Sequence, residues 1–225
     1  MPRTGGFAEY VCASESALAR KPASMTFEEV AAIPQAAVIA LQGIRDKGQV
    51  QPGQKVLISG AGGGAGTFAV QLAKLYGAEV TGVDNTGKLD FMRSLGADHV
   101  IDYTRQDFTK NGQHYNLILA ANGYHPILDY KRALGPEGTY VMTGGSGAQM
   151  FQSMTLGPIL SMTGSKKLGN LSMKANKGDL IFMKGLLEAG EVTPVIDRTY
   201  PLAEVPEAMR YLEEGHARGK VVITV

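Results

Sequence analysis

The stretch from Lys55 to Gly66 has the residue types and spacing to bind a pyrophosphate. The apolar run 56–58 predicts a short strand buried on both faces, and glycines follow it at once. In the pattern Gly-x-Gly-x-x-Gly, the first small residue permits a tight turn. The second lets the backbone approach a pyrophosphate, and the third packs a helix against the strand. Ala61, Gly63 and Gly66 occupy these three positions.

The residues that follow this loop fit the same kind of site. Apolar residues recur at helical spacing over 66–73, which predicts the helix that a dinucleotide site needs. A second strand is predicted over 79–84, and Asp84 stands at its end, where a carboxylate can hold a ribose hydroxyl. The alternative is a glycine turn with a purely structural role and a solvated Asp84. It does not explain why a strand, a helix and an acidic residue all follow in the order of a dinucleotide site.

Strands and helices alternate from residue 55 onward, which predicts an α/β fold: a Rossmann, doubly wound parallel sheet covered on both faces. Ligands of such sheets bind at the carboxyl ends of the strands. Strands are predicted at 55–59, 79–84, 98–102, 115–120 and 138–143, and helices at 64–76, 87–95 and 125–134.

The segments outside this alternation have weaker patterns. Alternation over 6–12 predicts a strand, Thr26 begins a capping-box-like helix start, and 159–165 is interpreted as a further strand. Helices are predicted over 179–189 and 203–214, an extended stretch from 195, and a terminal strand over 220–225.

Composition excludes several classes of function. The chain has 225 residues, with 22 basic and 21 acidic side chains and a net charge of +1, so it carries no electrostatic footprint for nucleic acid or an anionic membrane. No apolar run is long enough to span a membrane, and the amino terminus lacks the apolar core of a secretory signal, so we expect a cytoplasmic protein. Cys12 is the only cysteine, which rules out an internal disulfide, and we expect it on a partly buried strand.

Four stretches together make the chain recognisable: 6–10, 54–66, 94–103 and 217–223. With these motifs the chain resembles the medium-chain dehydrogenase/reductase superfamily, in its zinc-independent, quinone-reductase-like branch. The resemblance implies a GroES-like β domain, a Rossmann domain, and hydride transfer from a nicotinamide to a small carbonyl compound, alkene or quinone. It divides the chain into 1–35, the trailing part of the GroES-like domain, 36–175, the Rossmann domain, and 176–225, which returns to the GroES-like domain. Family members begin well before Gly5, so we expect only a remnant of the GroES-like domain here.

The resemblance also bears on metal and catalysis. Zinc-dependent relatives have a cysteine ligand where Gln35 stands, and a neutral amide is a poor zinc ligand, so no metal is predicted. No catalytic residue is assigned from the sequence.

The sequence leaves the choice between NAD and NADP open. Asp84 favours NAD, because a carboxylate accepts bonds from a 2′-hydroxyl and repels a 2′-phosphate. Lys88 and Tyr103 match positions where NADPH-using quinone reductases contact that phosphate, and Asn85 replaces a serine that assists them. The alternative for Lys88 is a solvated side chain at the start of a helix.

The resemblance places the nicotinamide near Asn122 and Gly144, where Asn122 either binds the carboxamide or caps a turn. The predicted cofactor-binding residues are Ala61, Gly63, Gly64, Ala65, Gly66, Asp84, Asn85, Lys88, Tyr103, Asn122 and Gly144. Relatives commonly pair the edge strands of two Rossmann sheets, which implies a homodimer formed here through 159–165.

Two other functions stay open at this point. One is a non-catalytic dinucleotide-binding module that regulates or scaffolds a partner. The other is a methyltransferase, although Ser59 stands where those enzymes usually have an acidic residue, and a helix after Gly66 suits a pyrophosphate better.

Overall fold

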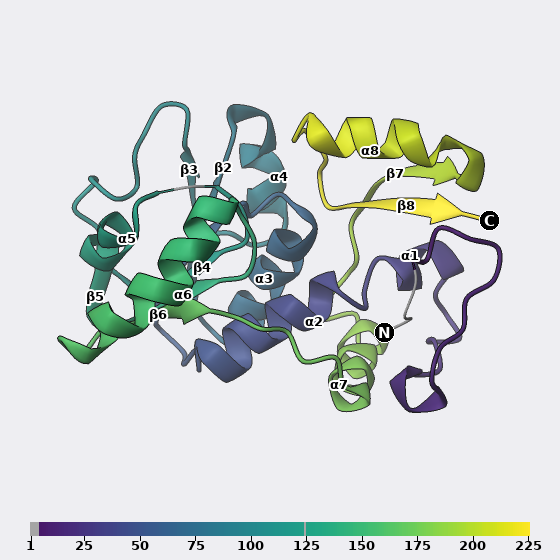
Figure 1. Cartoon of the computed structure of the whole chain (residues 1–225), viewed down its shortest axis with the longest axis horizontal. Coiled ribbons are helices and arrows are strands. Elements are labelled where there is room, and N and C mark those ends of the chain that lie inside the picture. Colours follow the sequence, from purple (N-terminus) through teal and green to yellow (C-terminus); the bar gives the residue numbers. More distant parts are fainter. Residues whose placement is uncertain (1–4, 124) are drawn as a thin grey trace.

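The chain forms a six-stranded parallel sheet with helices on both faces, and a separate two-stranded sheet near the carboxyl terminus (Figure 1). The computed structural model describes residues 5–123 and 125–225. The strands are β1 (Lys55–Ser59), β2 (Glu79–Asp84), β3 (His99–Asp102), β4 (Tyr115–Ala120), β5 (Leu134–Met142), β6 (Lys167–Asn170), β7 (Ile196–Pro201) and β8 (Lys220–Thr224). The α-helices are α1 (Phe27–Ala31), α2 (Ala36–Leu41), α3 (Gly64–Leu75), α4 (Leu89–Ser94), α5 (Ile127–Ala133), α6 (Gly147–Met162), α7 (Lys177–Glu188) and α8 (Val205–Glu213). A π-helical segment, η2 (Gln42–Lys47), extends α2, and short 3-10 turns are η1 (Glu15–Ala17), η3 (Thr86–Lys88) and η4 (Leu202–Glu204).

The strand order β3-β2-β1-β4-β5-β6 confirms the predicted doubly wound α/β fold. All five strand pairs of this sheet are parallel, and β1 lies between β2 and β4. The chain crosses the sheet between β3 and β4, so the order of strands reverses beside β1. Ligands of such sheets bind at the carboxyl ends of the strands at this switch point.

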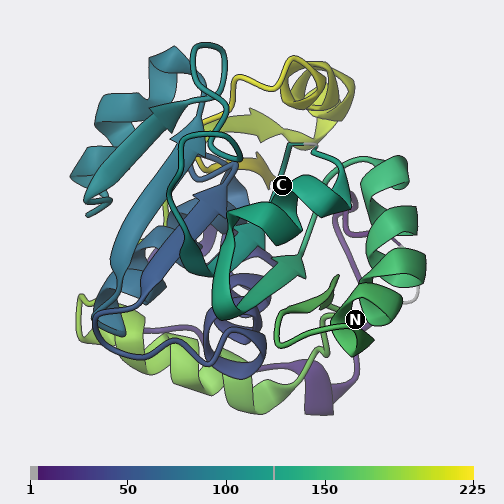
Figure 2. The same cartoon turned by 90° about the vertical axis from the view of Figure 1, so that its left-hand side faces the viewer.

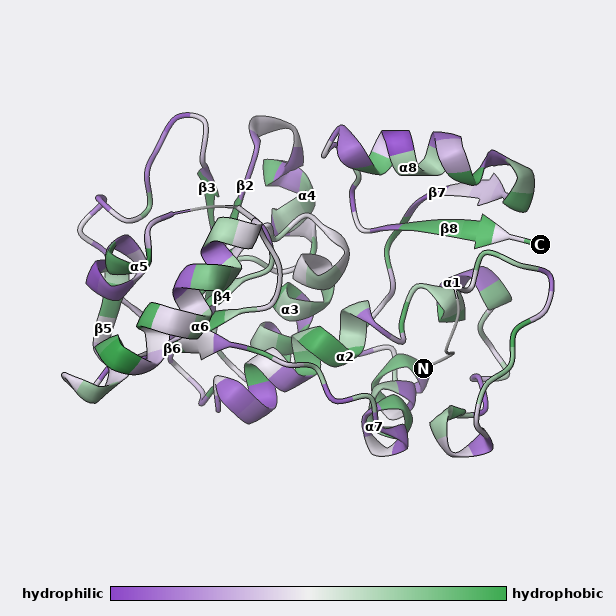
Figure 3. Cartoon of the chain, in the orientation of Figure 1, coloured by the Kyte–Doolittle hydropathy of each residue, from purple (hydrophilic) through white to green (hydrophobic). Residues whose placement is uncertain are grey.

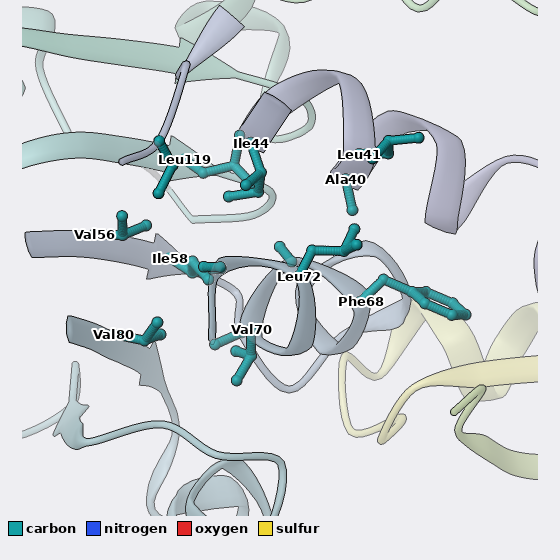
Figure 4. Close-up of a cluster of buried hydrophobic side chains, with 14 of the residues drawn as sticks. Ala40, Leu41, Ile44, Val56, Ile58, Phe68, Val70, Leu72, Val80 and Leu119 are labelled. Carbon is teal, nitrogen blue, oxygen red and sulfur yellow. The ribbon is translucent and has the colours of Figure 1, made fainter. Parts of the chain in front are cut away.

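Side chains of β1 are buried on both faces of the sheet, as the apolar run predicts. Val56 and Ile58 face α2, η2 and α3 in one apolar cluster, where Phe68 is fully buried (Figure 4). Leu57 belongs to the other cluster, on the opposite face, with Tyr140. Since both faces of β1 are packed, the loop that follows it starts from a rigid base.

The strands β7 and β8, with η4 and α8, make up what we call the C-terminal unit, residues 196–224. The two strands are parallel to each other and lie apart from the large sheet in Figure 1, whereas in the turned view of Figure 2 they lie behind it. The hydrophobic strand of the pair is β8, whereas β7 is largely hydrophilic (Figure 3). The pair is less buried than the large sheet, and Val222 is its one buried residue.

Most predicted elements are confirmed within a few residues, including the helices after residues 63, 176 and 204 and the capping box of Thr26 and Glu29. The predicted strand over 138–143 begins earlier, at Leu134. Of the helices in residues 5–123 and 125–225, none combines the length and apolar composition to cross a membrane.

Two predicted strands are wrong. Residues 6–12 are irregular and exposed, and Cys12 is exposed rather than partly buried, because no neighbouring strand pairs with this stretch in the described chain. Residues 159–162 end helix α6, and the edge strand is β6 instead. Gly157 lets α6 pack directly on the carbonyl of Leu168 in β6, and Ser161 hydrogen-bonds the Leu168 N–H at 2.8 Å.

Candidate cofactor site

The glycine loop links β1 to α3 at the switch point of the sheet. A side chain at Gly66 would overlap the carbonyl oxygen of Gly60, so helix and strand approach more closely than any other residue permits. Gly60 has a positive φ of 77° and donates its N–H to Val83 O of β2 at 2.9 Å. Ala61 is completely buried beneath the turn. The close approach at Gly66 and the burial of Ala61 agree with the packing expected at these two positions, whereas the role of Gly63 beside a pyrophosphate stays a prediction.

The amino terminus of α3 can receive an anion. Gly63 is the N-cap residue, and its position provides no capping side chain for the first turn. The N–H groups of Gly64, Ala65 and Gly66 belong to the first turn, where a helix has no internal acceptors. Such an end, together with the helix dipole, suits a phosphate. The loop thus fits the pyrophosphate of a dinucleotide.

Asp84 lies against the glycine loop, but its carboxylate is engaged by the backbone. It is 6% exposed, and its two oxygens accept the N–H groups of Gly62 at 3.0 Å and Asn85 at 2.9 Å. The ammonium of Lys88 is 3.6 Å from Oδ1. Asp84 therefore links the glycine loop to the loop after β2, and the ammonium of Lys88 compensates its negative charge.

Lys88 is buried rather than solvated, so the solvated alternative is wrong. It is 5% exposed, and its Nζ donates to the carbonyl of Gly215 in the C-terminal unit at 3.3 Å. Its stem passes beneath Gly62, where a Cβ would lie 2.7 Å from the Lys88 Cδ. The C-terminal unit thus reaches the loop after β2.

The rest of this loop is fixed by hydrogen bonds with the end of β3 and the residue that follows it. The hydroxyl of Thr86 donates to Asp102 at the end of β3. Hydrogen bonds from Thr86 and Thr104 lower the pKa of Asp102 below its ordinary value. Tyr103 donates its N–H to Asp84 O at 3.1 Å while its ring is 58% exposed. Tyr103 thus stands at the rim of the same loop.

The predicted nicotinamide end forms where β1, β4 and β5 finish. A Cβ at Gly60 would lie 2.7 Å from the Cβ of Asn122, and a side chain at Gly144 would overlap the carbonyl of Ala121. The Asn122 Oδ1 accepts the N–H of Gly123 at 2.8 Å, which is the turn-capping geometry. Ser59 Oγ donates to the Asn122 carbonyl at 2.7 Å. These ends therefore present mainly backbone to a ligand.

Sequence reasoning missed the contribution of the C-terminal unit to this site. Gly219 donates its N–H to Gly62 O at 2.9 Å and forms a parallel bridge with Gly63. The stem of Lys220 packs on Gly64, with Cδ 2.7 Å from where a Cβ would stand. Burial lowers the pKa of Lys220, and among the described residues no carboxylate lies within ion-pair distance of its ammonium. The motif 217–223 was visible in the sequence, but its contact with residue 62 was not.

No metal centre is evident in residues 5–123 and 125–225, where no group of three or more His, Cys, Asp or Glu side chains could hold an ion. Gln35 instead lines a largely apolar cavity of ≈ 550 Å³ between the amino-terminal segment, α2 and α7. That cavity is lined by none of the predicted cofactor residues. The absence of zinc stays a prediction.

Fold and site together define a Rossmann-type dinucleotide-binding protein. Residues 95–223 match the family model described as "Zinc-binding dehydrogenase". The chain is 33% identical over 246 residues to the mitochondrial NAD(P)H oxidoreductase RTN4IP1 of Mus musculus, covering 99% of this chain and 62% of that protein. It is also 33% identical over 231 residues to a chloroplast envelope quinone oxidoreductase homolog of Arabidopsis thaliana, covering 97% of this chain and 68% of that protein.

Solved structures agree with these relatives. A quinone oxidoreductase from Coxiella burnetii superposes with a TM-score of 0.86 at 27% identity, covering 96% of this chain and 67% of that one. An NAD-dependent alcohol dehydrogenase superposes with a TM-score of 0.83 at 32% identity, covering 99% and 66%. The chain belongs to the medium-chain dehydrogenase/reductase superfamily, in its quinone-reductase-like branch. It spans 62% of the length of the mouse relative.

Proposed function

We propose that this chain binds NADH or NADPH across the carboxyl ends of β1, β4 and β5 and takes part in zinc-independent hydride transfer to a quinone, an enone or an aldehyde. The observation that carries the proposal is the close-packed turn at Gly60–Gly66, which opens an uncapped helix amino terminus at the switch point of the sheet. When bound, the nicotinamide supplies the hydride chemistry. The names of the mouse and Arabidopsis relatives support an NAD(P)H oxidoreductase and a quinone oxidoreductase.

Each group of residues has a defined task in this proposal. The N–H groups of Gly64 and Ala65 bind the pyrophosphate, and the Lys220 ammonium adds positive charge beside them. Gly144 lets the end of β5 approach Ala121 beside the nicotinamide, and Asn122, whose Oδ1 accepts the Gly123 N–H, binds the carboxamide through its side-chain NH2 group. No side chain is assigned as a proton donor. The division into residues 1–35, 36–175 and 176–225 is part of the proposal, supported by the irregular linker between β6 and α7.

Binding and turnover test different parts of this proposal. A native-state ligand raises the melting temperature, so titration with NADH, NADPH and S-adenosylmethionine separates a dinucleotide site from a methyltransferase site. We expect stabilisation by the nicotinamide cofactors alone. Oxidation of the reduced cofactor by a panel of quinones, enones and aldehydes then tests the reaction. Stabilisation by S-adenosylmethionine alone would refute the proposal.

A second candidate is a non-catalytic dinucleotide-binding module. It is favoured by the separation between the apolar cavity and the predicted cofactor residues, none of which lines that cavity. Clear cofactor binding without turnover on any substrate of the panel would favour this module over the enzyme.

We further propose that the chain forms a homodimer in the cytoplasm, through the edge strand β6 and the exposed face of α6. Helix α6 contains no charged residue, and Phe151, Ile159 and Met162 are 69%, 59% and 87% exposed on it. It lies on the left of Figure 1, whereas the C-terminal unit lies on the right, and it forms the right-hand edge of the molecule in Figure 2. A second copy would cover this apolar face and pair the open edge of β6. Light scattering of the wild-type chain and of Phe151→Asp tests the dimer, which the introduced charge should dissociate.

The names of the relatives place them in mitochondria and chloroplasts, so the cytoplasmic location is a separate prediction, tested by imaging a tagged chain.

A further inference from the structure

Arg218 of the C-terminal unit lies between the two loops that flank the adenosine ribose in a Rossmann site. Its neighbour Gly219 donates to Gly62 O of the glycine loop at 2.9 Å. Its own Nη2 donates to the carbonyl of Gly87, in the loop after β2, at 2.9 Å. In this fold the pyrophosphate lies over the first loop and the ribose hydroxyls face the second. The guanidinium is therefore held beside the place where a 2′-substituent of the cofactor would be.

The carboxylate that would repel a 2′-phosphate is covered. Asp84 accepts two backbone N–H groups and lies 3.6 Å from the Lys88 ammonium, and its side chain is 8% exposed. Lys88 is equally buried and is bound to Asp84 and to Gly215 O. Within this pair the two charges offset each other, so neither presents a free charge to the ribose.

Arg218, in contrast, is exposed, and Gly87 occupies only one of the five N–H donors that a guanidinium carries. A guanidinium anchored at one corner can bind phosphate through two parallel hydrogen bonds, which a neutral hydroxyl cannot accept equally. The anchor at Gly87 also reduces the side-chain entropy that binding would cost.

We propose that Arg218 reads the 2′-phosphate of the cofactor, so that this chain selects NADPH over NADH. The inference deepens the proposed function and rests on it. Its consequence is that the preference is set from outside the Rossmann sheet, by a residue 156 positions after Gly62 (218 − 62). Lys220, two residues further along, faces Gly64 of the pyrophosphate loop and should act on both cofactors alike.

The test is the ratio of the dissociation constants for NADH and NADPH, measured by cofactor fluorescence on the full chain. For Arg218→Gln, which keeps the stem and a hydrogen-bond donor, we expect NADPH binding to weaken about tenfold, and NADH binding to change less than about twofold. Arg218→Lys keeps the charge and should recover part of the NADPH affinity. Arg210→Gln, on an exposed arginine of α8 paired with Glu207, is the matched control and should change neither constant. Competition with 2′,5′-ADP and 5′-ADP should show the same loss for the 2′-phosphorylated fragment alone.

Three results would overturn the inference. The first is wild-type affinity for NADH that equals or exceeds that for NADPH. The second is an equal loss of both affinities in Arg218→Gln, which would indicate a structural role in joining the loops. The third is no loss at all. A wild-type chain that binds neither cofactor would overturn the proposed function and this inference together, so the two failures are distinguishable.

Discussion

The six-stranded sheet and the C-terminal unit are stabilised in different ways. Strands β1 and β4 are buried on both faces, and Val56, Leu57, Ile58 and Ile118 have no exposed area. In the C-terminal unit, β7 has no buried residue and β8 has one, Val222. The large sheet is therefore stabilised by its own apolar core. The C-terminal unit has little core of its own, so its stability depends on its contacts with the rest of the chain.

The C-terminal unit contacts the loops of the proposed cofactor site, and its strand β8 also lies near α1. Gly219 bonds Gly62, Arg218 bonds Gly87, and Gly215 receives the Lys88 ammonium. The loops that hold the cofactor are also the loops that hold the unit. We therefore expect substitutions in the sheet to change stability, and substitutions at the contact to change cofactor affinity.

The largest expected effect is on the core of the sheet. Phe68→Ala removes a fully buried ring from the cluster of α2, α3 and β1 and should lower the free energy of unfolding by about 3–5 kcal/mol. Phe27→Ala, on a ring that is 78% exposed near the amino terminus, should change it by less than about 0.5 kcal/mol. Urea denaturation of both variants measures the difference. Similar losses would mean that the flanking segment is as tightly packed as the sheet.

Gly66→Ala should be the next largest change, since its Cβ would overlap the carbonyl of Gly60. We expect a loss of about 1–3 kcal/mol in stability and a weakening of NADPH binding by about a hundredfold, because the turn must open. Gly185→Ala is the matched control: it lies within α7 with no atom within 4 Å of the added methyl group. This control should gain about 0.5–1 kcal/mol. Unchanged cofactor affinity in Gly66→Ala would contradict the predicted role of the turn.

Lys220→Gln tests the contact between the C-terminal unit and the glycine loop directly. Removing the charge of Lys220, whose stem packs on Gly64, should weaken NADH and NADPH binding about tenfold each, with little change in the free energy of unfolding. Lys184→Gln, on α7, should leave both affinities unchanged. A loss confined to one cofactor would place the ammonium elsewhere than beside the pyrophosphate.

The smallest predicted effect concerns the junction of α7 with η2. Burial disfavours the charged form of Asp179, but hydrogen bonds from Gln42, Arg45 and Asn176 outweigh it and lower the pKa of Asp179 below its ordinary 3.8. A lowered folded-state pKa contributes stability that is present above the unfolded value and is lost as pH falls through the folded value.

We therefore expect stability to fall below about pH 4, and Asp179→Asn to make that fall shallower, because the asparagine cannot take up the proton. Chemical denaturation between pH 6 and pH 2 measures this. Asp90→Asn, on a carboxyl group that is 99% exposed, should follow the wild-type curve. An Asp179→Asn curve parallel to wild type would show that the network does not depend on the charge.

Local sequence patterns determined the sheet and the glycine turn. Residues 56–58 and most of 79–84 are buried on both faces of the sheet, as expected for central parallel strands. The spacing of Ala61, Gly63 and Gly66 indicates a dinucleotide site because a strand precedes it and a helix follows it. These features involve residues close in sequence, so periodicity and turn chemistry suffice to predict them.

Tertiary contacts decided the remainder. The uncharged segment 147–162 is helical because Gly157 and Ser161 fit against β6, which no local pattern shows. Residues 6–12 have alternation but no partner strand in the described chain, and a strand is stable only within a sheet. Arg218 and Lys220 were not predicted as site residues from the sequence, and the burial of Lys88 against the C-terminal unit was not predicted either. Their roles arise because the C-terminal unit, more than a hundred residues further along the chain, folds back onto the loops after β1 and β2. Local sequence patterns do not show which distant segments will be in contact.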